Sequence, residues 1–282
     1  GAILEGALDS MTSEILVVLG VGVLSFAFRS VQNQAAFRIG TLGLVFTSFL
    51  AGWLLGGSAL LGVVFASTWF LLPWLEILTR VRRLRLPLHR PLEKSPPPPA
   101  SRFPGFGDLS EELEAIGFEH SDDVDWSHDG MRQFYRLLYS AERRTAASIC
   151  IVEQGAMSFF YVTFSSRAAD GRIFMTWNYP FSYGMHLLPN MVANRVDEDL
   201  AAEELASEHQ SFLEKSNLAD ADLAERQLHE LRPEFEKDLR LQLEHNIARG
   251  ILARDGQELI RYSVRGWFFL WGQFLREFVK FG

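Results

Sequence analysis

The sequence has almost no cysteine and lacks the common catalytic motifs. Its 282 residues include one cysteine, Cys150, which excludes a disulfide framework and any zinc or iron–sulfur site built from several cysteines. It contains no P-loop, no dinucleotide-binding glycine motif, no serine-hydrolase elbow and no zinc-protease motif. We therefore predict no catalytic residue, no metal and no cofactor, and a protein that is not an enzyme.

Basic residues are in deficit, but only in the later part of the chain. The sequence has 27 Lys and Arg against 35 Asp and Glu, a net charge of −8. Residues 1–100 hold eight basic and five acidic side chains, whereas residues 101–282 hold 19 and 30. So negative a region repels phosphate backbones, and nucleic acid is not an expected partner.

Charge is absent altogether from residues 39–75, a run of 37. A single helix of that length would measure roughly 55 Å, against a hydrocarbon core of about 30 Å in a bilayer. The run must turn back, and the Gly-Gly-Ser sequence at residues 56–58 is the natural place. We predict membrane helices over about 38–56 and 58–79. The alternative is a hydrophobic hairpin in the core of a water-soluble protein.

A shorter apolar stretch, residues 15–28, comes before this run. With its flanking residues it predicts a first spanning helix over about 12–30, and a re-entrant or interfacial helix is the alternative. The acidic residues before it argue against a secretory signal peptide. The anchor thus comprises two or three transmembrane helices within residues 1–90 and ends in a basic juxtamembrane segment.

The arginines predict an orientation. Arg29 and Arg38 flank the first loop, and five more arginines follow the third helix within residues 80–90. Positively charged loops mark the cytoplasmic side of a membrane. Three spans with the N-terminus outside place both groups inside. We predict a multi-pass protein of a bacterial-type inner membrane with a cytoplasmic domain over residues 108–256.

A proline-rich segment, residues 91–107, separates the anchor from that domain. Its four consecutive prolines at 96–99 predict an extended polyproline II spacer. The capping pattern between Asp108 and Glu111 predicts that a short helix starts there.

An antiparallel β-meander is predicted next. Its strands are runs of β-forming residues separated by turn signals, at 133–139, 145–152, 157–166 and 172–178. Residues 118–124 form a possible fifth strand. The third strand is apolar on both faces and should be central and covered on both sides. Helices over about 197–215 and 220–251 are candidates for this cover, and the apolar stripe of the second favours packing on the sheet over a coiled-coil arm.

The last segment, residues 257–282, predicts an amphipathic helix with aromatic bulk on one face and basic residues on the other. Its uncharged centre is too short to span a bilayer. The pattern is typical of a helix in an anionic cytoplasmic interface or against a partner, and packing on the protein's own sheet is the alternative. The fold class is therefore a membrane-anchored α+β protein that ends in an amphipathic helix.

Two sets of site residues follow from these patterns. Basic and aromatic side chains are expected at the membrane interface: Arg80, Arg82, Arg83, Arg85, Trp69, Trp74, Trp267, Trp271, Phe274, Phe278, Arg265 and Arg276. Small residues at a spacing of four are expected to let helices pack closely, within the chain or between chains: Gly52, Gly56, Ser58 and Gly62.

Two further segments carry polar or aromatic clusters. Residues 119–130 contain Asp123, Asp125 and His128, but His128 stands where a calcium-binding loop needs glycine, so a solvated acidic loop is the interpretation. Residues 178–184 form an aromatic turn that lines a pocket or caps the sheet.

Two functions are favoured by this inventory, and a membrane-bound enzyme whose site is assembled from dispersed residues, with carboxylates clustered near His120 or His128, is a third alternative. The first is a non-catalytic accessory or scaffold subunit of an inner-membrane assembly, which docks a partner protein or a second copy through its acidic domain. The second is a membrane sensor or effector whose sheet domain binds a small ligand and biases the transmembrane helices. Convergent polar groups in a pocket near residues 178–183 would favour the second.

Overall fold

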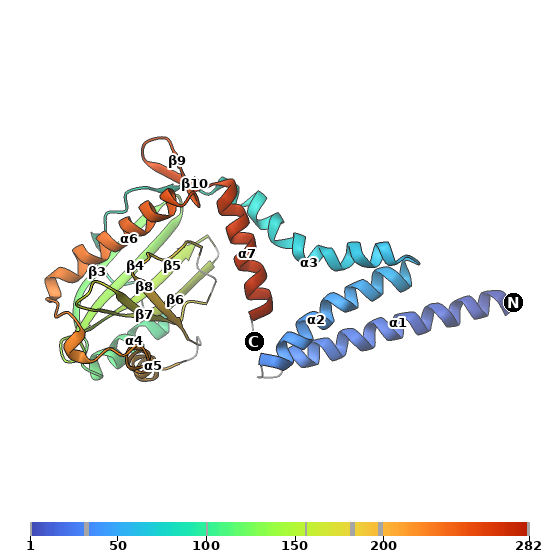
Figure 1. Ribbon diagram of the computed structural model, residues 1–282, viewed down its shortest axis with the longest axis horizontal. Helices are drawn as coiled ribbons and strands as arrows, with labels where there is room; N and C mark the ends of the chain where they lie inside the picture. The colour runs from blue at the N-terminus through green and yellow to red at the C-terminus, as the bar shows by residue number, and fades with distance from the viewer. Residues whose placement is uncertain are drawn as a thin grey trace. The chain divides into compact units, whose positions relative to one another are not determined.

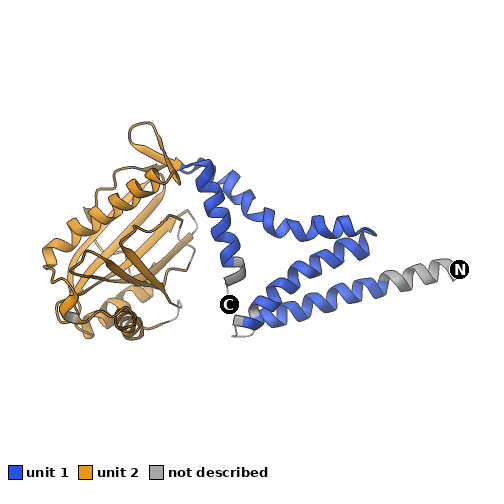
Figure 2. Cartoon of the chain, in the orientation of Figure 1, with its two compact units in different colours: residues 1–84, 262–282 blue, residues 85–261 orange. Residues whose placement is uncertain are grey.

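The protein is described by a computed structural model, which covers residues 2–30, 34–99, 101–155, 157–180, 184–196 and 200–280. The chain forms two compact units, which Figure 2 colours separately. The helical unit combines the two ends of the chain, Gly1–Leu84 and Tyr262–Gly282. The sheet unit is the continuous segment Arg85–Arg261. The predicted combination of apolar N-terminal helices with an α+β part is confirmed.

Three long apolar helices open the helical unit (Figure 1). They are α1 (Ala2–Arg29), α2 (Gln34–Leu50), which continues into the π-helical turn η1 (Ala51–Leu55), and α3 (Ala59–Thr79). Their candidate spans are Thr12–Arg29, Arg38–Leu55 and Ala59–Arg83. Each is long and apolar enough to cross a bilayer, so the unit is compatible with a multi-pass membrane protein.

The predicted turn between the second and third helices is confirmed. Gly57 has a φ of 68°, which glycine adopts without the steric penalty of a side chain. The hydroxyl oxygen of Ser58 accepts a hydrogen bond from the backbone N–H of Leu60 at 3.2 Å and caps α3. Ser58 therefore acts as a cap here.

Glycines bring the backbones on either side of this turn into contact. A Cβ atom at Gly52 would lie 2.5 Å from the carbonyl oxygen of Leu61, and one at Gly62 would lie 2.7 Å from that of Phe49. Such an approach requires residues without a side chain. The glycine spacing thus packs two helices of the same chain, while Gly56 lies in the turn itself, directly before Gly57.

The last helix, α7 (Val264–Lys280), also belongs to the helical unit and runs crosswise to α1 and α2 in Figure 1. It starts later than the predicted residue 257. The residues before it form a hairpin of β9 (Leu252–Asp255) and β10 (Leu259–Tyr262), with Gly256 at a φ of 77° in the turn. The amphipathic helix is therefore shorter than its pattern indicated.

The proline-rich segment lies within the sheet unit. It contains β2 (Glu93–Lys94) and the start of α4 (Pro104–Ala115), and β1 (Leu86–Pro87) comes shortly before it. Leu92 and Phe103 are buried, at 1% and 5% exposure, so both ends of the segment that was predicted as an extended spacer pack into the core of the sheet unit. The predicted helix start at Asp108 is wrong, because Pro104 occupies the first turn, where its missing N–H is tolerated.

A seven-stranded sheet forms the centre of the sheet unit, in the order β2-β3-β4-β5-β6-β7-β8. Its longer strands are β3 (Glu119–His128), β4 (Met131–Ser140), β5 (Thr145–Gln154), β6 (Met157–Arg167), β7 (Ile173–Trp177) and β8 (Met191–Arg195). The predicted meander is confirmed with its fifth strand, and all its pairs are antiparallel. The sequence did not indicate β8, which pairs with β7 in parallel.

Helices cover both faces of this sheet, as predicted for its central strands. In Figure 1, α4 and α5 (Ala202–Lys215) lie on one side of the sheet and α6 (Leu231–Ala248) on the other. Val162 and Phe164 of β6 join the core under α4 and α5. On the opposite face the ring of Phe235 on α6 packs edge-on against Tyr135, with centroids 4.8 Å apart. The apolar stripe of α6 thus packs on the sheet.

Candidate functional site

The acidic segment 119–130 is a strand and a hairpin turn, so its interpretation as a loop is wrong. Asp129 and Gly130 have φ values of 47° and 75°, the backbone of a tight two-residue β-hairpin. Alternate residues of β3 face opposite sides of the sheet, and Val124 and Trp126 are buried. The acidic residues of this segment therefore belong to a regular strand that pairs with β4.

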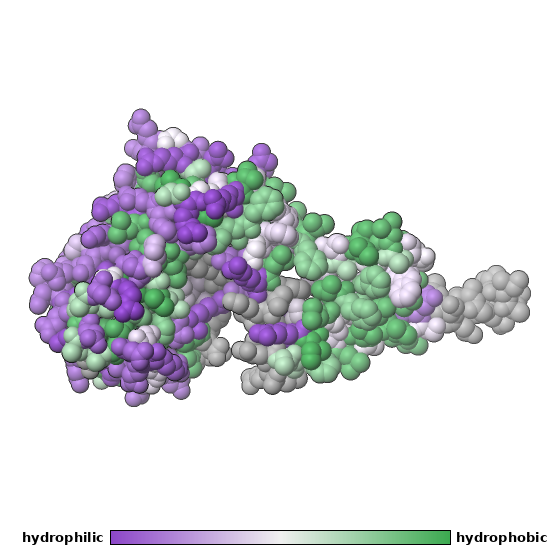
Figure 3. All heavy atoms as spheres, in the orientation of Figure 1, coloured by the Kyte–Doolittle hydropathy of each residue, from purple (hydrophilic) through white to green (hydrophobic). Residues whose placement is uncertain are grey.

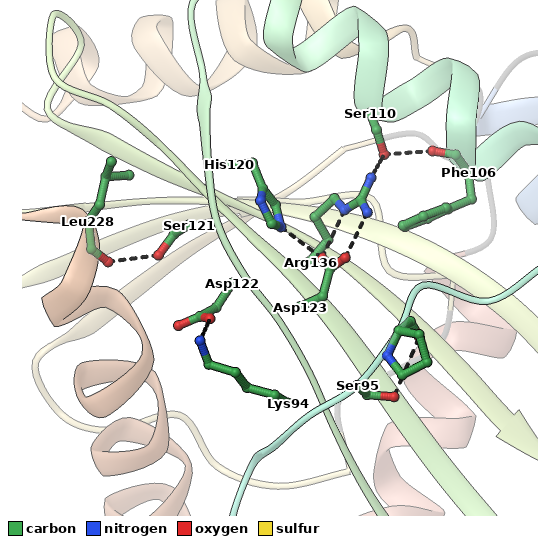
Figure 4. A network of polar contacts seen from close by, with 11 residues as sticks. Lys94, Ser95, Phe106, Ser110, His120, Ser121, Asp122, Asp123, Arg136 and Leu228 are labelled. Atoms are coloured by element: carbon green, nitrogen blue, oxygen red, sulfur yellow. Dashed lines mark hydrogen bonds and ion pairs between the residues drawn. The ribbon is translucent and has the colours of Figure 1, made fainter.

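Ion pairs neutralise these acidic side chains (Figure 4). Asp123 lies between Arg136, whose nitrogens donate to both carboxylate oxygens at 2.9 and 2.7 Å, and His120 at 3.0 Å. Burial raises the pKa of Asp123, but the hydrogen bonds with Arg136 and His120 outweigh it and hold this pKa below its usual value. Asp125 pairs with Arg132 at 2.6 Å. Asp123 and Asp125 thus have arginine partners, and Asp122 pairs with Lys94 at 3.1 Å. No cluster of His, Cys, Asp or Glu with metal-site geometry occurs among the described residues.

Two side chains of types that often take part in catalysis, Cys150 and His209, are buried in the core of the sheet unit. Cys150 is 1% exposed, and burial raises the pKa of its thiol to about 12, so the thiol packs in the core and its reactive thiolate form is disfavoured. His209 of α5 lies between the hydroxyls of Ser166 at 3.0 Å and Thr176 at 2.9 Å. Burial lowers the pKa of His209 to about 4, and the charge of Arg226 acts in the same direction. The imidazole is therefore neutral and fully hydrogen-bonded at neutral pH.

A cavity of about 120 Å³ lies between α6 and the sheet. This is roughly ten times the space that one water molecule requires. Its walls are mostly apolar and include Leu137, Ile173, Met175, Trp177, Phe235 and Leu239. An apolar cavity with a few convergent polar groups is the usual form of a small-molecule site.

Four charged side chains also line this cavity and bind one another. Arg167 of β6 contacts Glu234 at 3.2 Å and also Asp238, both on α6. Arg226 contacts Glu234 at 3.5 Å and donates to the carbonyl oxygen of Ser165 at 2.7 Å. Burial raises the pKa of Asp238, against the opposing effect of the Arg167 charge. The cluster thus contains two guanidinium groups and two carboxyl groups in a partly buried position.

No pattern in the sequence marks these four charged residues as a cluster. Glu234 and Asp238 follow each other at i and i+4 on an acidic helix, which is normally a solvated face. Arg226 lies in a stretch that was predicted as helix, whereas the chain there is irregular between two short turns, η3 (Asp220–Asp222) and η4 (Leu228–Glu230). The apolar stripe of α6 could have indicated their position. It predicts that α6 packs on the sheet, and charged residues that flank the stripe, such as Glu234 and Asp238, then lie at the edge of that contact.

The aromatic turn lies close to the cavity wall. Its first residue, Asn178, follows Trp177 and accepts a hydrogen bond from the backbone N–H of Val162 at 2.7 Å. Tyr179 packs edge-on against Tyr161, with centroids 4.8 Å apart. Residues 181–183 lie outside the described residues. The part that is described supports the end of the sheet.

The predicted interface tryptophans make specific contacts within the helical unit. Trp69 donates from its indole nitrogen to the hydroxyl of Ser48 at 2.8 Å and so links α3 to α2. The ring of Trp74 packs against Trp271 at 6.1 Å and Phe268 at 5.0 Å, both on α7. The amphipathic helix therefore docks on the third apolar helix through its aromatic face.

Most of the other predicted interface residues have exposed side chains. Arg80, Arg82, Arg83, Arg265, Arg276 and Phe274 are exposed, while Arg85 forms an ion pair with Asp255 and Trp267 is partly buried. The side chain of Phe278 lies outside the described residues. Figure 3 shows hydrophobic residues gathered over the described part of the apolar N-terminal helices and hydrophilic residues over the sheet unit.

Comparisons with protein family models, with curated proteins and with solved structures find no match for this chain. Its function must therefore be argued from its own geometry.

Proposed function

We propose that this protein is a membrane-anchored sensor or effector whose sheet unit binds a small molecule in the cavity under α6. The cavity is the observation that carries this proposal, because it joins apolar walls to a convergent set of charged groups. The cavity wall includes Trp177, the residue before the aromatic turn for which the sequence suggested a pocket.

The anchor is proposed to be a three-span membrane unit with the N-terminus outside and the sheet unit in the cytoplasm, in a bacterial-type inner membrane. The exposed arginines after α3 support this orientation, because basic residues favour the cytoplasmic side. The acidic residues of α1 (Glu5, Asp9 and Glu14) all precede its apolar stretch, whereas Arg29 follows that stretch as the last residue of the helix.

A covalent path connects the cavity with the helical unit. The helix α6 ends at Ala248 and leads through Gly250 into the β9–β10 hairpin, and α7 follows at Val264. Strand β10 pairs with β1, where Leu86 lies opposite Ile260. The two strands by which the chain enters and leaves the sheet unit are thus hydrogen-bonded to each other. A ligand that moves α6 is expected to shift this strand pair and the helices attached to it.

The test is a thermal-shift screen of the full-length protein in lipid nanodiscs against a metabolite and nucleotide library. Ala146 lines the cavity, opposite Tyr139 and Ser165 on the neighbouring strands. A library compound that binds at this cavity should stabilise the wild type and the matched Ala146→Ser control but not the Ala146→Leu variant, whose larger side chain fills the space. No stabilising compound, or hits that are insensitive to Ala146→Leu, would reject the proposal.

The accessory-subunit hypothesis makes a different prediction. A scaffold that docks a partner should co-purify with that partner from native membranes, whatever occupies the cavity. Equal recovery of a bound chain with the wild type and Ala146→Leu would favour the scaffold, whereas a protein that elutes alone would count against it.

A further inference from the structure

The start of α7 lies beside the end of α3, because the two helices run antiparallel where they touch. Phe268 packs edge-on against Trp74, with centroids 5.0 Å apart. Three residues later on α7, Trp271 bonds to the carbonyl oxygen of Phe70, four residues earlier on α3. Positions that advance along α7 thus go back along α3. Extended in the other direction, the same register brings the first turn of α7 next to the last turn of α3.

In the proposed three-span anchor, α7 then lies along the membrane surface. It contacts α2 as well as α3, and Figure 1 shows it crosswise to α1 and α2. A helix that crosses spanning helices in this way runs in the plane of the bilayer, at the level of the head groups. The junction of α3 and α7 is therefore within reach of lipid head groups.

Exposed arginines gather at this junction. Arg80, Arg82 and Arg83 follow α3, Arg265 is the second residue of α7, and all four side chains are exposed. The only acidic side chain in these two segments is Glu76, which pairs with Arg80 at 3.3 Å. Four arginines and one glutamate leave a net charge of +3. Arg83 and Arg265 have no acidic partner among the described residues.

Apolar side chains are exposed directly next to these arginines. Leu75 and Leu78 of α3 are 66% and 47% exposed, and Val264 and Phe268 of α7 are 59% and 55% exposed. Leaving so much apolar surface in water is unfavourable. An anion that carries hydrocarbon chains would cover this surface and neutralise the arginines at the same time. A soluble anion would do only the second.

The arginines also restrict the head group. A guanidinium group donates two parallel hydrogen bonds to phosphate oxygens, which makes arginine well suited to bind a phosphodiester. A zwitterionic lipid would bring its own ammonium group into a positively charged cluster, where the like charges repel. A lipid with net negative charge instead gains about fivefold in affinity for each basic residue near the membrane surface.

We propose that the junction of α3 and α7 binds an anionic phospholipid, with its phosphate on Arg83 and Arg265 and its acyl chains along the apolar side chains beside them. This inference goes beyond the proposed cavity function and depends only on the proposed membrane anchor. It assigns to α7 a preference for one class of head group, in addition to the affinity for bilayers that any amphipathic helix has.

The test compares two head groups on the same tails. Native mass spectrometry of the full-length protein, released from detergent micelles, follows separate titrations with dioleoyl-phosphatidylglycerol and dioleoyl-phosphatidylcholine. With two arginines on its phosphate, the anionic lipid should bind at least about tenfold more tightly. The preference should weaken as ammonium acetate is raised, because salt screens exposed charges. Glycerophosphoglycerol, which has the head group without acyl chains, should not compete.

Two double variants locate the site. Arg83→Gln with Arg265→Gln should lower the preference for phosphatidylglycerol by about tenfold, while phosphatidylcholine binds as before. Arg143→Gln with Arg172→Gln is the matched control, because it removes the same charge from two turns of the sheet unit, before β5 and before β7. It should keep the wild-type preference. If the first variant does not insert into the membrane, Arg265→Gln alone leaves the arginines after α3 in place and should lower the preference about fivefold.

The outcomes separate this inference from the proposed function. Equal binding of the two lipids by the wild type, or a preference that the arginine variants of α3 and α7 retain, would overturn the lipid site and leave the cavity function untouched. An equal loss in the control variant would assign the preference to the net charge of the whole protein and overturn the site as well. Competition by glycerophosphoglycerol would identify a soluble phosphate ligand in place of a lipid.

A protein that stays in solution without detergent or lipid would remove the membrane anchor and this inference with it. The cavity is tested separately, by the library screen with Ala146→Leu.

Discussion

Trp271, near the end of the chain, donates a hydrogen bond from its indole nitrogen to the backbone carbonyl oxygen of Phe70, at 2.8 Å and 201 positions earlier in the sequence. The acceptor lies close to Pro73, a residue without an N–H inside α3. Together with the edge-on contact of Trp74 with Phe268 and its tilted contact with Trp271, this hydrogen bond joins the last helix to α3.

The first prediction concerns this contact. Trp271→Phe keeps an aromatic ring but removes the donor, which should weaken the docking of α7 by about 1 kcal/mol. Amide hydrogen exchange in α7, measured in nanodiscs, should then become about fivefold faster. Trp267→Phe is the matched control, because the buried indole N–H of Trp267 has no hydrogen-bond partner among the described residues. Equal exchange rates in the two variants would contradict the assigned contact.

The second prediction concerns the glycine contact between α2 and α3. In Gly62→Ala the new Cβ atom would lie 2.7 Å from the carbonyl oxygen of Phe49, so the helices must separate, at a cost of about 1–3 kcal/mol. Thermal unfolding in mild detergent, followed by tryptophan fluorescence, should show a lower midpoint. Gly20→Ala provides the comparison, since no described atom lies within 4 Å of a Cβ there. A midpoint equally low for Gly20→Ala would argue against helix separation as the cause.

The third prediction concerns the only cysteine. Cys150 is buried, with a thiol pKa of about 12, so a maleimide at pH 8 should not label it while the sheet unit is folded. Labelling should appear only as denaturant opens the unit. The exposed Ser207 of α5 offers the reference, because Ser207→Cys in a Cys150→Ser background should react at once. Rapid labelling of native wild type would show that β5 is more accessible than the structure indicates.

The fourth prediction concerns the pH dependence of the stability of the sheet unit, measured at each pH by denaturant unfolding followed by tryptophan fluorescence. The unfolded chain protonates His209 near its ordinary pKa of 6.5, whereas the folded chain does so only near 4. The contribution of His209 to the free energy of unfolding is therefore complete above pH 6.5. It is lost between pH 6.5 and pH 4, by up to roughly 3 kcal/mol.

A variant without the titrating group tests this assignment. His209→Gln keeps hydrogen-bonding capacity towards Ser166 and Thr176 and should lose this part of the pH dependence. The stability difference between wild type and variant should thus shrink as the pH falls from 6.5 to 4. Parallel stability curves over this range would assign the pH dependence to other groups.

The sequence by itself determined the elements whose signals are local. The charge-free run of residues 39–75 exceeds the thickness of a bilayer and must turn, and the turn occurs at its glycines. Alternating and continuous apolar patterns predicted four strands of the meander and indicated a possible fifth. The apolar stripe of α6 predicted a helix that covers the sheet. Periodicity along a segment suffices for such predictions, because it states which face is buried.

Only the tertiary structure decided which distant groups meet. Arg226 and Glu234 look like solvated surface residues in the sequence, since a charged residue carries no local signal of burial, and the fold places them with Arg167 in a cavity wall. Likewise the pairing of β1 with β10 and the docking of Trp271 on α3 join segments far apart in the chain. Periodicity identifies the buried face of an element but not the residues that this face contacts. The candidate site consists of contacts between residues far apart in the sequence, so only the tertiary structure reveals it.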